Sequence, residues 1–110
     1  MIKQNVIAAT SVNVGIHELL GHGTGKLLMQ RDDGSFNFDH GTLLDPFTKK
    51  PVTSYYKPGE TFGGVFGQLG SSYEECRAEA VSLYLCVQPE LLSIFDITDH
   101  TKQQHVIHTL

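Results

Sequence analysis

The sequence predicts a mainly α-helical protein in which two helices, joined by a long irregular loop, carry the functional residues. Three observations support this prediction. Residues 6–21 contain apolar side chains at helix-like density, and residues 72–87 combine apolar and charged side chains with helix start and stop signals. The stretch between them is rich in glycine, proline and aspartate, which favour turns.

The first predicted helix, residues 6–21, has apolar side chains on more than one face, so we expect it to be largely buried. Many of these side chains are β-branched and lower the intrinsic helix propensity. Tertiary packing must therefore stabilise this helix.

The middle of the chain, residues 31–70, is dominated by turn signals such as DDGS, DHGT and LGSS. Short strands are expected only at residues 36–38 and 52–56. The segment is predicted to be an ordered excursion, because aromatic residues can anchor it. These residues are Phe36, Phe38, Phe47, Tyr55, Tyr56, Phe62 and Phe66.

The second functional helix is predicted at residues 72–87. Ser71 followed three residues later by Glu74 forms a capping-box pattern, and a proline two residues after the helix marks its end. Two further short helices are predicted at residues 89–95 and 101–109.

Composition excludes several classes of partner. The formal net charge is -4 and no dense cluster of Lys and Arg occurs, which argues against nucleic acid and anionic membrane as partners. No stretch is long and apolar enough to span a bilayer. Cys76 and Cys86 lie ten residues apart on one predicted helix, too far apart to form a disulfide. We interpret them as buried free thiols, and we expect a cytoplasmic protein.

The stretch IHELLGHGTGK contains two histidines with an unusual separation. A common zinc-protease signature, H-E-x-x-H, places two histidines four residues apart on one helical face. His17 and His22 are five apart and would differ by about 140° around a regular helix. A π-bulge adds one residue to a turn and restores the shared face. Gly21 is the position where such a distortion costs least sterically.

Two histidines leave a catalytic zinc site short of one protein ligand. The stretch EECRAE provides three carboxylates, those of Glu74, Glu75 and Glu79, on the second functional helix. One of them could bind the metal while the others accept hydrogen bonds from the histidine rings. Glu18, next to the first histidine, is then placed as the general base that deprotonates a zinc-bound water.

The two motifs together resemble those of a known family. HELLGH, residues 17–22, and EECRAE, residues 74–79, are similar to the H-E-x-x-G-H and E-E-x-x-A-E signatures of the dipeptidyl peptidase III family. The flanking GTGKLL, KPGET, SSY and LYLC also look like that family, so the resemblance covers nearly the whole chain.

The resemblance implies one Zn²⁺ per chain and a role for each acidic or imidazole side chain of the motifs. The implied zinc ligands are His17, His22 and Glu75. Glu18 is implied as the catalytic base, and Glu74 and Glu79 as hydrogen-bond partners of the two histidines. Arg77 is interpreted as an ion-pair partner of neighbouring acids.

The resemblance also implies an activity: the release of N-terminal dipeptides from oligopeptides, mainly in the cytoplasm. Family members have two lobes that flank a wide cleft, and the zinc site lies in the largely helical lobe. Family members are much longer than this chain. Residues 1–110 are therefore expected to be part of the catalytic lobe and to be inactive alone.

Two further expectations concern protein partners. Some animal members of the family carry an E-T-G-E loop that recruits a ubiquitin-ligase adaptor. Residues 46–50 read PFTKK at that place, which argues against this partner. An alternative to the enzyme is a catalytically silent unit that keeps the helical pair for packing or protein binding.

Overall fold

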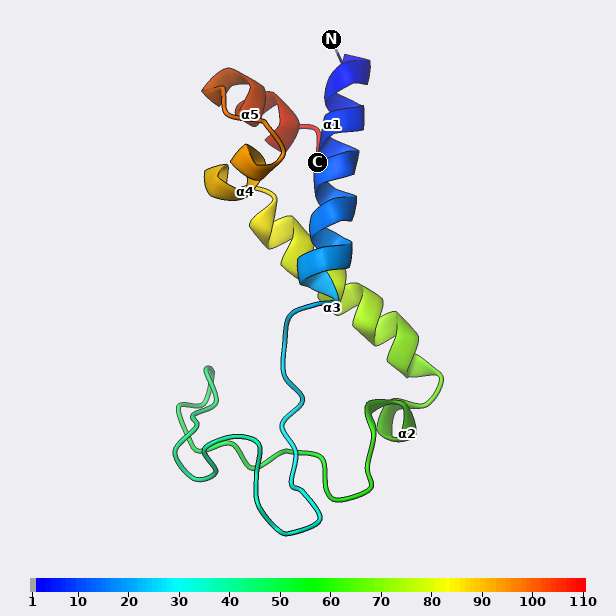
Figure 1. Ribbon diagram of the computed structural model, residues 1–110, viewed down its shortest axis with the longest axis vertical. Coiled ribbons are helices and arrows are strands. Elements are labelled where there is room, and N and C mark those ends of the chain that lie inside the picture. The colour runs from blue at the N-terminus through cyan, green and yellow to red at the C-terminus, as the bar shows by residue number, and fades with distance from the viewer. Residues whose placement is uncertain (1) are drawn as a thin grey trace. The chain divides into compact units, whose positions relative to one another are not determined.

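The computed structural model describes residues 2–110, with side chains described from residue 5 onward. The helical elements, in chain order, are α1 Ile2–Ile16, the π-helical turn η1 His17–Gly21, α2 Phe62–Phe66, α3 Leu69–Leu85, α4 Pro89–Ile94 and α5 His100–Ile107 (Figure 1). β-pairing in this part of the chain is limited to isolated bridges. The prediction of a mainly α protein is therefore confirmed.

The chain forms two compact units. One consists of the chain up to Thr24 together with Ser71–Leu110, and the other of Gly25–Gly70. Among the described residues, no helix has the length and apolar character needed to cross a membrane.

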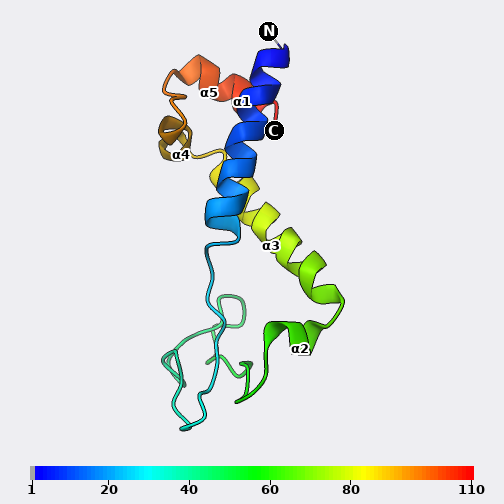
Figure 2. The same cartoon turned by 45° about the vertical axis from the view of Figure 1, so that its right-hand side comes forward.

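In the first unit, α3 crosses obliquely near the C-terminal end of α1 (Figures 1 and 2), and α1 packs against α5. Ala9, Val12 and Ile16 form a buried stripe at spacings of three and four residues, as expected for one face of a helix. They meet buried side chains of the C-terminal part of the chain, including Leu92 and Val106.

Only one face of α1 is buried, so the expectation of a largely buried helix is wrong. Val6, Ile7 and Val14 are 45%, 69% and 52% exposed. Apolar composition on several faces does not show how many faces neighbouring helices cover.

The packed face of α3 is made of small side chains four residues apart. Ala78 and Ser82 are fully buried at this spacing, and Cys86, the first residue after the helix, continues it. The hydroxyl of Ser82 donates to the backbone carbonyl of Asn13 at 2.9 Å, which fixes the register between α1 and α3. Small side chains allow the two helices to approach closely.

The two cysteines are both free, as predicted, but they lie in different environments. Cys86 is buried, and this burial raises the pKa of its thiol. Cys76 is exposed, so the expectation that it is buried is wrong.

Helix α3 begins at Leu69, earlier than predicted, so Ser71 lies inside the helix and the capping-box prediction is wrong. Gly67 has φ +54° and ends α2. This left-handed conformation is inexpensive for glycine and allows α3 to start two residues later. The two short C-terminal helices, α4 and α5, are confirmed at nearly the predicted positions.

The second unit is irregular but ordered by aromatic contacts and turns. The rings of Phe36 and His40 are stacked, with centroids 4.1 Å apart, and Tyr55 meets Phe36 edge to face at 5.1 Å. The expected strands at residues 36–38 and 52–56 reduce to single bridges. The aromatic anchoring is confirmed for Phe36, Phe38 and Tyr55. It is wrong for Phe47, which is 90% exposed. The frequent turns leave no room for a regular ladder.

Helix α2 was not expected from the sequence. The side chain of Thr61 accepts a hydrogen bond from the backbone N–H of Gly64 at 3.0 Å and so caps the helix. Because FGGVF contains two glycines, which have low helix propensity, propensity alone does not predict this short helix.

The PFTKK segment forms a tight turn. The carboxylate of Asp45 accepts hydrogen bonds from the backbone N–H groups of Phe47 and Thr48, at 2.9 and 2.7 Å. These bonds lower the pKa of Asp45. Lys49 follows with φ +58° and its backbone N–H bonds back to the Asp45 carbonyl.

Candidate metal centre

The turn that carries the first histidine is π-helical. The backbone N–H of His22 donates to the carbonyl of His17 at 3.0 Å, a bond that spans five residues. The extra residue rotates the second histidine toward the first, and the ring centroids lie 4.8 Å apart at an interplanar angle of 81°. The widened turn predicted from the spacing is therefore confirmed.

Gly21 is required at this turn because α3 passes very close to it. A Cβ atom on Gly21 would lie 2.7 Å from the backbone oxygen of Ala78 and 3.0 Å from its Cα and Cβ. Backbone atoms cannot move aside as a flexible side chain can. The glycine therefore serves the contact between η1 and α3 as well as the local distortion.

We expect Gly21→Ala to lower the free energy of unfolding by about 1–3 kcal/mol, as overpacking usually does. Chemical denaturation followed by circular dichroism measures this change. Gly63→Ala is the matched control, because a Cβ at Gly63 meets no atom within 4 Å. Equal stability of the two variants would contradict the role assigned to the close approach.

Each histidine ring has one nitrogen directed at its own glutamate. His17 Nδ1 lies 2.9 Å from Glu79 Oε2, and His22 Nδ1 lies 3.2 Å from Glu74 Oε1. A carboxylate can only accept, so each ring donates to its own glutamate in the tautomer that has its proton on Nδ1. A neutral imidazole with its proton on Nδ1 has a free lone pair on Nε2.

The other nitrogen of each ring faces a single carboxylate, that of Glu75. His17 Nε2 lies 3.2 Å from Glu75 Oε2, and His22 Nε2 lies 3.5 Å from Glu75 Oε1. One ligand atom from each of these three residues lies within 4.8 Å of the other two. The three side chains therefore converge on one place.

This arrangement fits a zinc ion. Two ligand atoms bonded to tetrahedral Zn²⁺ at ordinary lengths lie about 3.3 to 3.5 Å apart. The nitrogen–oxygen distances of 3.2 and 3.5 Å, each to a different oxygen of Glu75, are close to that separation, and the three ligand atoms all lie within 4.8 Å of one another. Two imidazoles and one carboxylate are also a known donor set of catalytic zinc sites. The carboxylate of Glu75 is 63% exposed, which leaves an approach from solvent.

The electrostatics of the cluster favour a cation. With neutral histidines, the two motifs contain four carboxylates and one guanidinium, a formal charge of -3. The guanidinium of Arg77, and then the ring of His22, hold the pKa of Glu74 at about 2, so this group stays an acceptor. The Glu79 carboxylate raises the pKa of His17. A dication would relieve the repulsion among these acids.

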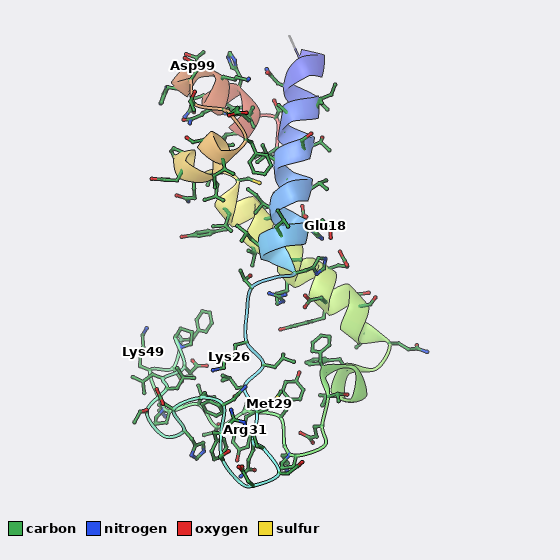
Figure 3. The ribbon with its side chains drawn as sticks, in the orientation of Figure 1. Glu18, Lys26, Met29, Arg31, Lys49 and Asp99 are labelled. Carbon is green, nitrogen blue, oxygen red and sulfur yellow. The ribbon has the colours of Figure 1, made fainter. Side chains whose placement is uncertain are left out.

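Glu18 extends from the π-helical turn itself (Figure 3). Its side chain is exposed, and its charge adds to the raised pKa of His17. Beside the cluster, an open surface depression is bordered by His17 and Glu75, with Ala80 and Leu83 forming part of its apolar wall.

Sequence reasoning missed one group that supports the cluster. The amide of Asn13 donates to Glu79 Oε1 at 3.3 Å, and its oxygen accepts from the buried hydroxyl of Ser82. Asn13 precedes His17 by four residues and so shares its helical face. That spacing was a signal in the sequence. The ion pair expected for Arg77 is confirmed, and its partner is Glu74.

Comparison with known proteins places the chain in a family. The model of peptidase family M49 matches residues 1–110. The chain is similar to dipeptidyl peptidase 3 of Homo sapiens, with 55% identity over 84 residues, which is 76% of this chain and 11% of that protein. It is 50% identical over 97 residues to dipeptidyl peptidase 3 of Rattus norvegicus, covering 88% of this chain and 13% of that protein.

A more distant relative gives the same result. Dipeptidyl peptidase 3 of Dictyostelium discoideum is 45% identical over 103 residues, covering 91% of this chain and 15% of that protein. The chain thus spans between a tenth and a sixth of the length of these relatives. With the family model matched from the first residue to the last, this protein belongs to peptidase family M49.

Proposed function

We propose that this chain provides the zinc-binding part of the active site of a dipeptidyl peptidase. The ligands are Nε2 of His17, Nε2 of His22 and the carboxylate of Glu75, with one Zn²⁺ per chain. One observation carries the proposal: both Nε2 atoms face the same carboxylate, while each Nδ1 faces a glutamate of its own. Such outer carboxylates are the usual partners of zinc-binding histidines.

The reaction is peptide hydrolysis. When bound, Zn²⁺ would supply a Lewis acid that makes water more acidic and polarises a carbonyl group. Glu18 acts as the general base, and its carboxylate accepts a proton from the attacking water. The water oxygen bonds to the peptide carbonyl carbon, the C–N bond breaks, and the proton is passed to the leaving amine. The products are a carboxylic acid and a free amine.

The substrate class follows from the relatives, which are named dipeptidyl peptidases. We infer that oligopeptides lose their N-terminal dipeptides at this site in a larger, two-lobed cytoplasmic enzyme. Residues 1–110 form part of its catalytic lobe and are inactive alone. Contacts that hold the substrate's free amine then come from the remainder of such an enzyme.

Metal analysis of the purified 110-residue chain tests the proposal. We expect close to one Zn²⁺ per chain after saturation and removal of excess metal, measured by elemental analysis. His40→Ala is a control that should keep this stoichiometry, because His40 stacks on Phe36 in the other unit. A folded chain that takes up no Zn²⁺ would reject the metal site and favour the silent packing unit.

A further inference from the structure

Arg77 contacts both Glu74, whose carboxylate faces the ring of His22, and the backbone that follows His22. Its Nε donates to Glu74 Oε2 at 2.9 Å, and its Nη2 donates to Glu74 Oε1. Its Nη1 donates to the backbone carbonyl of Thr24 at 2.9 Å. The guanidinium therefore makes three directed hydrogen bonds to two different parts of the first unit.

The two bonds to Glu74 restrain the orientation of that carboxylate. A planar guanidinium that pairs with both oxygens of a carboxylate fixes its plane as well as its position. Glu74 Oε1, held in this way, is the atom that lies 3.2 Å from His22 Nδ1. The hydrogen bond to the histidine ring thus depends on a carboxylate that Arg77 holds in place.

The bond to Thr24 restrains the backbone on the other side of the histidine. The N–H of Thr24 already donates to the carbonyl of Leu20 in η1 at 3.0 Å. Its carbonyl is then tied to α3 through Arg77. His22 lies between these two attachments, one acting on its ring and one on its backbone.

We propose that Arg77 is a positioning residue for His22: it holds Glu74 so that His22 keeps its proton on Nδ1 and directs the lone pair of Nε2 toward Glu75. The inference rests on the proposed zinc site. It assigns Arg77 no contact with metal or substrate.

The simpler interpretation is an ordinary exposed ion pair on one helix. Arg77 and Glu74 are three residues apart, and their side chains are 31% and 33% exposed. Such a pair changes the stability of the fold slightly and would leave the ring of His22 unaffected. The two interpretations therefore differ in what the loss of Arg77 should do to the tautomer of His22 and to the affinity of the chain for Zn²⁺.

The first experiment compares Zn²⁺ affinity of the full chain and its variants by competition with a chromogenic chelator. We expect Arg77→Met to bind Zn²⁺ about 10- to 100-fold more weakly, the usual effect of losing an outer partner. Arg77→Lys should recover only part of the loss, because an ammonium cannot pair with both oxygens in one plane. Arg31→Met is the matched control, an exposed arginine bonded to a backbone carbonyl in the other unit.

A double-mutant cycle with Glu74→Gln tests whether Arg77 acts through this acid. If it does, the affinity losses of Arg77→Met and Glu74→Gln will be far from additive in the double variant. Additive losses, or a wild-type affinity for Arg77→Met, would overturn the proposal. Circular dichroism of each variant shows whether helical structure is retained.

Nitrogen NMR of the metal-free chain provides a readout that does not depend on zinc. Spectra are recorded at a pH where the histidines are neutral. In Arg77→Met, the fraction of His22 that has its proton on Nδ1 should fall. The corresponding fraction of His17, whose Nδ1 faces Glu79, should stay unchanged. An unchanged His22 would refute the positioning role. If the wild-type chain binds no Zn²⁺, the proposed function fails, and this measurement still decides the role of Arg77.

Discussion

Replacement of Glu75 by glutamine is expected to weaken Zn²⁺ binding by more than about 100-fold, because loss of an outer partner alone costs about 10- to 100-fold. Both oxygens of Glu75 face a histidine Nε2, at 3.2 and 3.5 Å. An amide in the same place turns an N–H₂ donor toward one of these nitrogens and removes the negative charge. Chelator competition with the purified chain measures the effect.

The same substitution should leave the metal-free fold almost unchanged. Glu75 is 63% exposed, so no buried contact is lost. The control is Glu90→Gln on α4, an exposed glutamate in the first turn of a helix outside the motifs. If Glu75→Gln binds Zn²⁺ within a few-fold of wild type, Glu75 is not a ligand.

Replacement of Glu18 by glutamine should have the opposite pattern: bound metal is kept and catalysis is lost. Glutamine has the shape of glutamate but cannot accept a proton from water at neutral pH, so we expect the hydrolysis rate to fall about 10²- to 10⁴-fold. The measurement uses a version of the protein that spans the full length of its relatives. Release of a dipeptide from a chromogenic dipeptide amide is compared with the Zn²⁺ content of the same sample.

A matched control for this experiment is again Glu90→Gln, which removes one carboxylate from α4, outside the two motifs. It should change neither metal content nor turnover. Turnover retained in Glu18→Gln would assign the base to another group. Loss of metal in that variant would instead indicate that Glu18 holds the site together.

The sequence predicted those parts of the fold that depend on short-range rules. The helices after Pro89 and the widened turn at Gly21 were both found, because proline geometry and residue spacing act locally. The start of α3 and the burial of α1 were misjudged. The start of α3 follows the left-handed Gly67 that ends α2, a conformation that the sequence permits but does not dictate. The burial of α1 depends on what lies next to it in space, and a pattern of apolar residues does not contain that information.

The sequence and the family resemblance proposed which residues form the candidate site. The sequence motifs by themselves did not determine which carboxylate faces which histidine. Three carboxylates within six residues could face the histidines in several ways. The antiparallel contact of α1 and α3 decided between them, since it pairs Glu79 with His17 and Glu74 with His22. That contact depends on Gly21 meeting the backbone of Ala78.

By itself, the sequence showed that two histidines five residues apart cannot share a face of a regular α-helix, and it pointed to a π-helical turn as the distortion that brings them together. Only the tertiary structure decided which ring nitrogen meets which acid, and that Asn13 and Arg77 hold those acids in place. These choices depend on the close approach of two helical segments that are some fifty residues apart in the chain. How closely two such segments approach in space is set by packing and not by the spacing of residues along the chain.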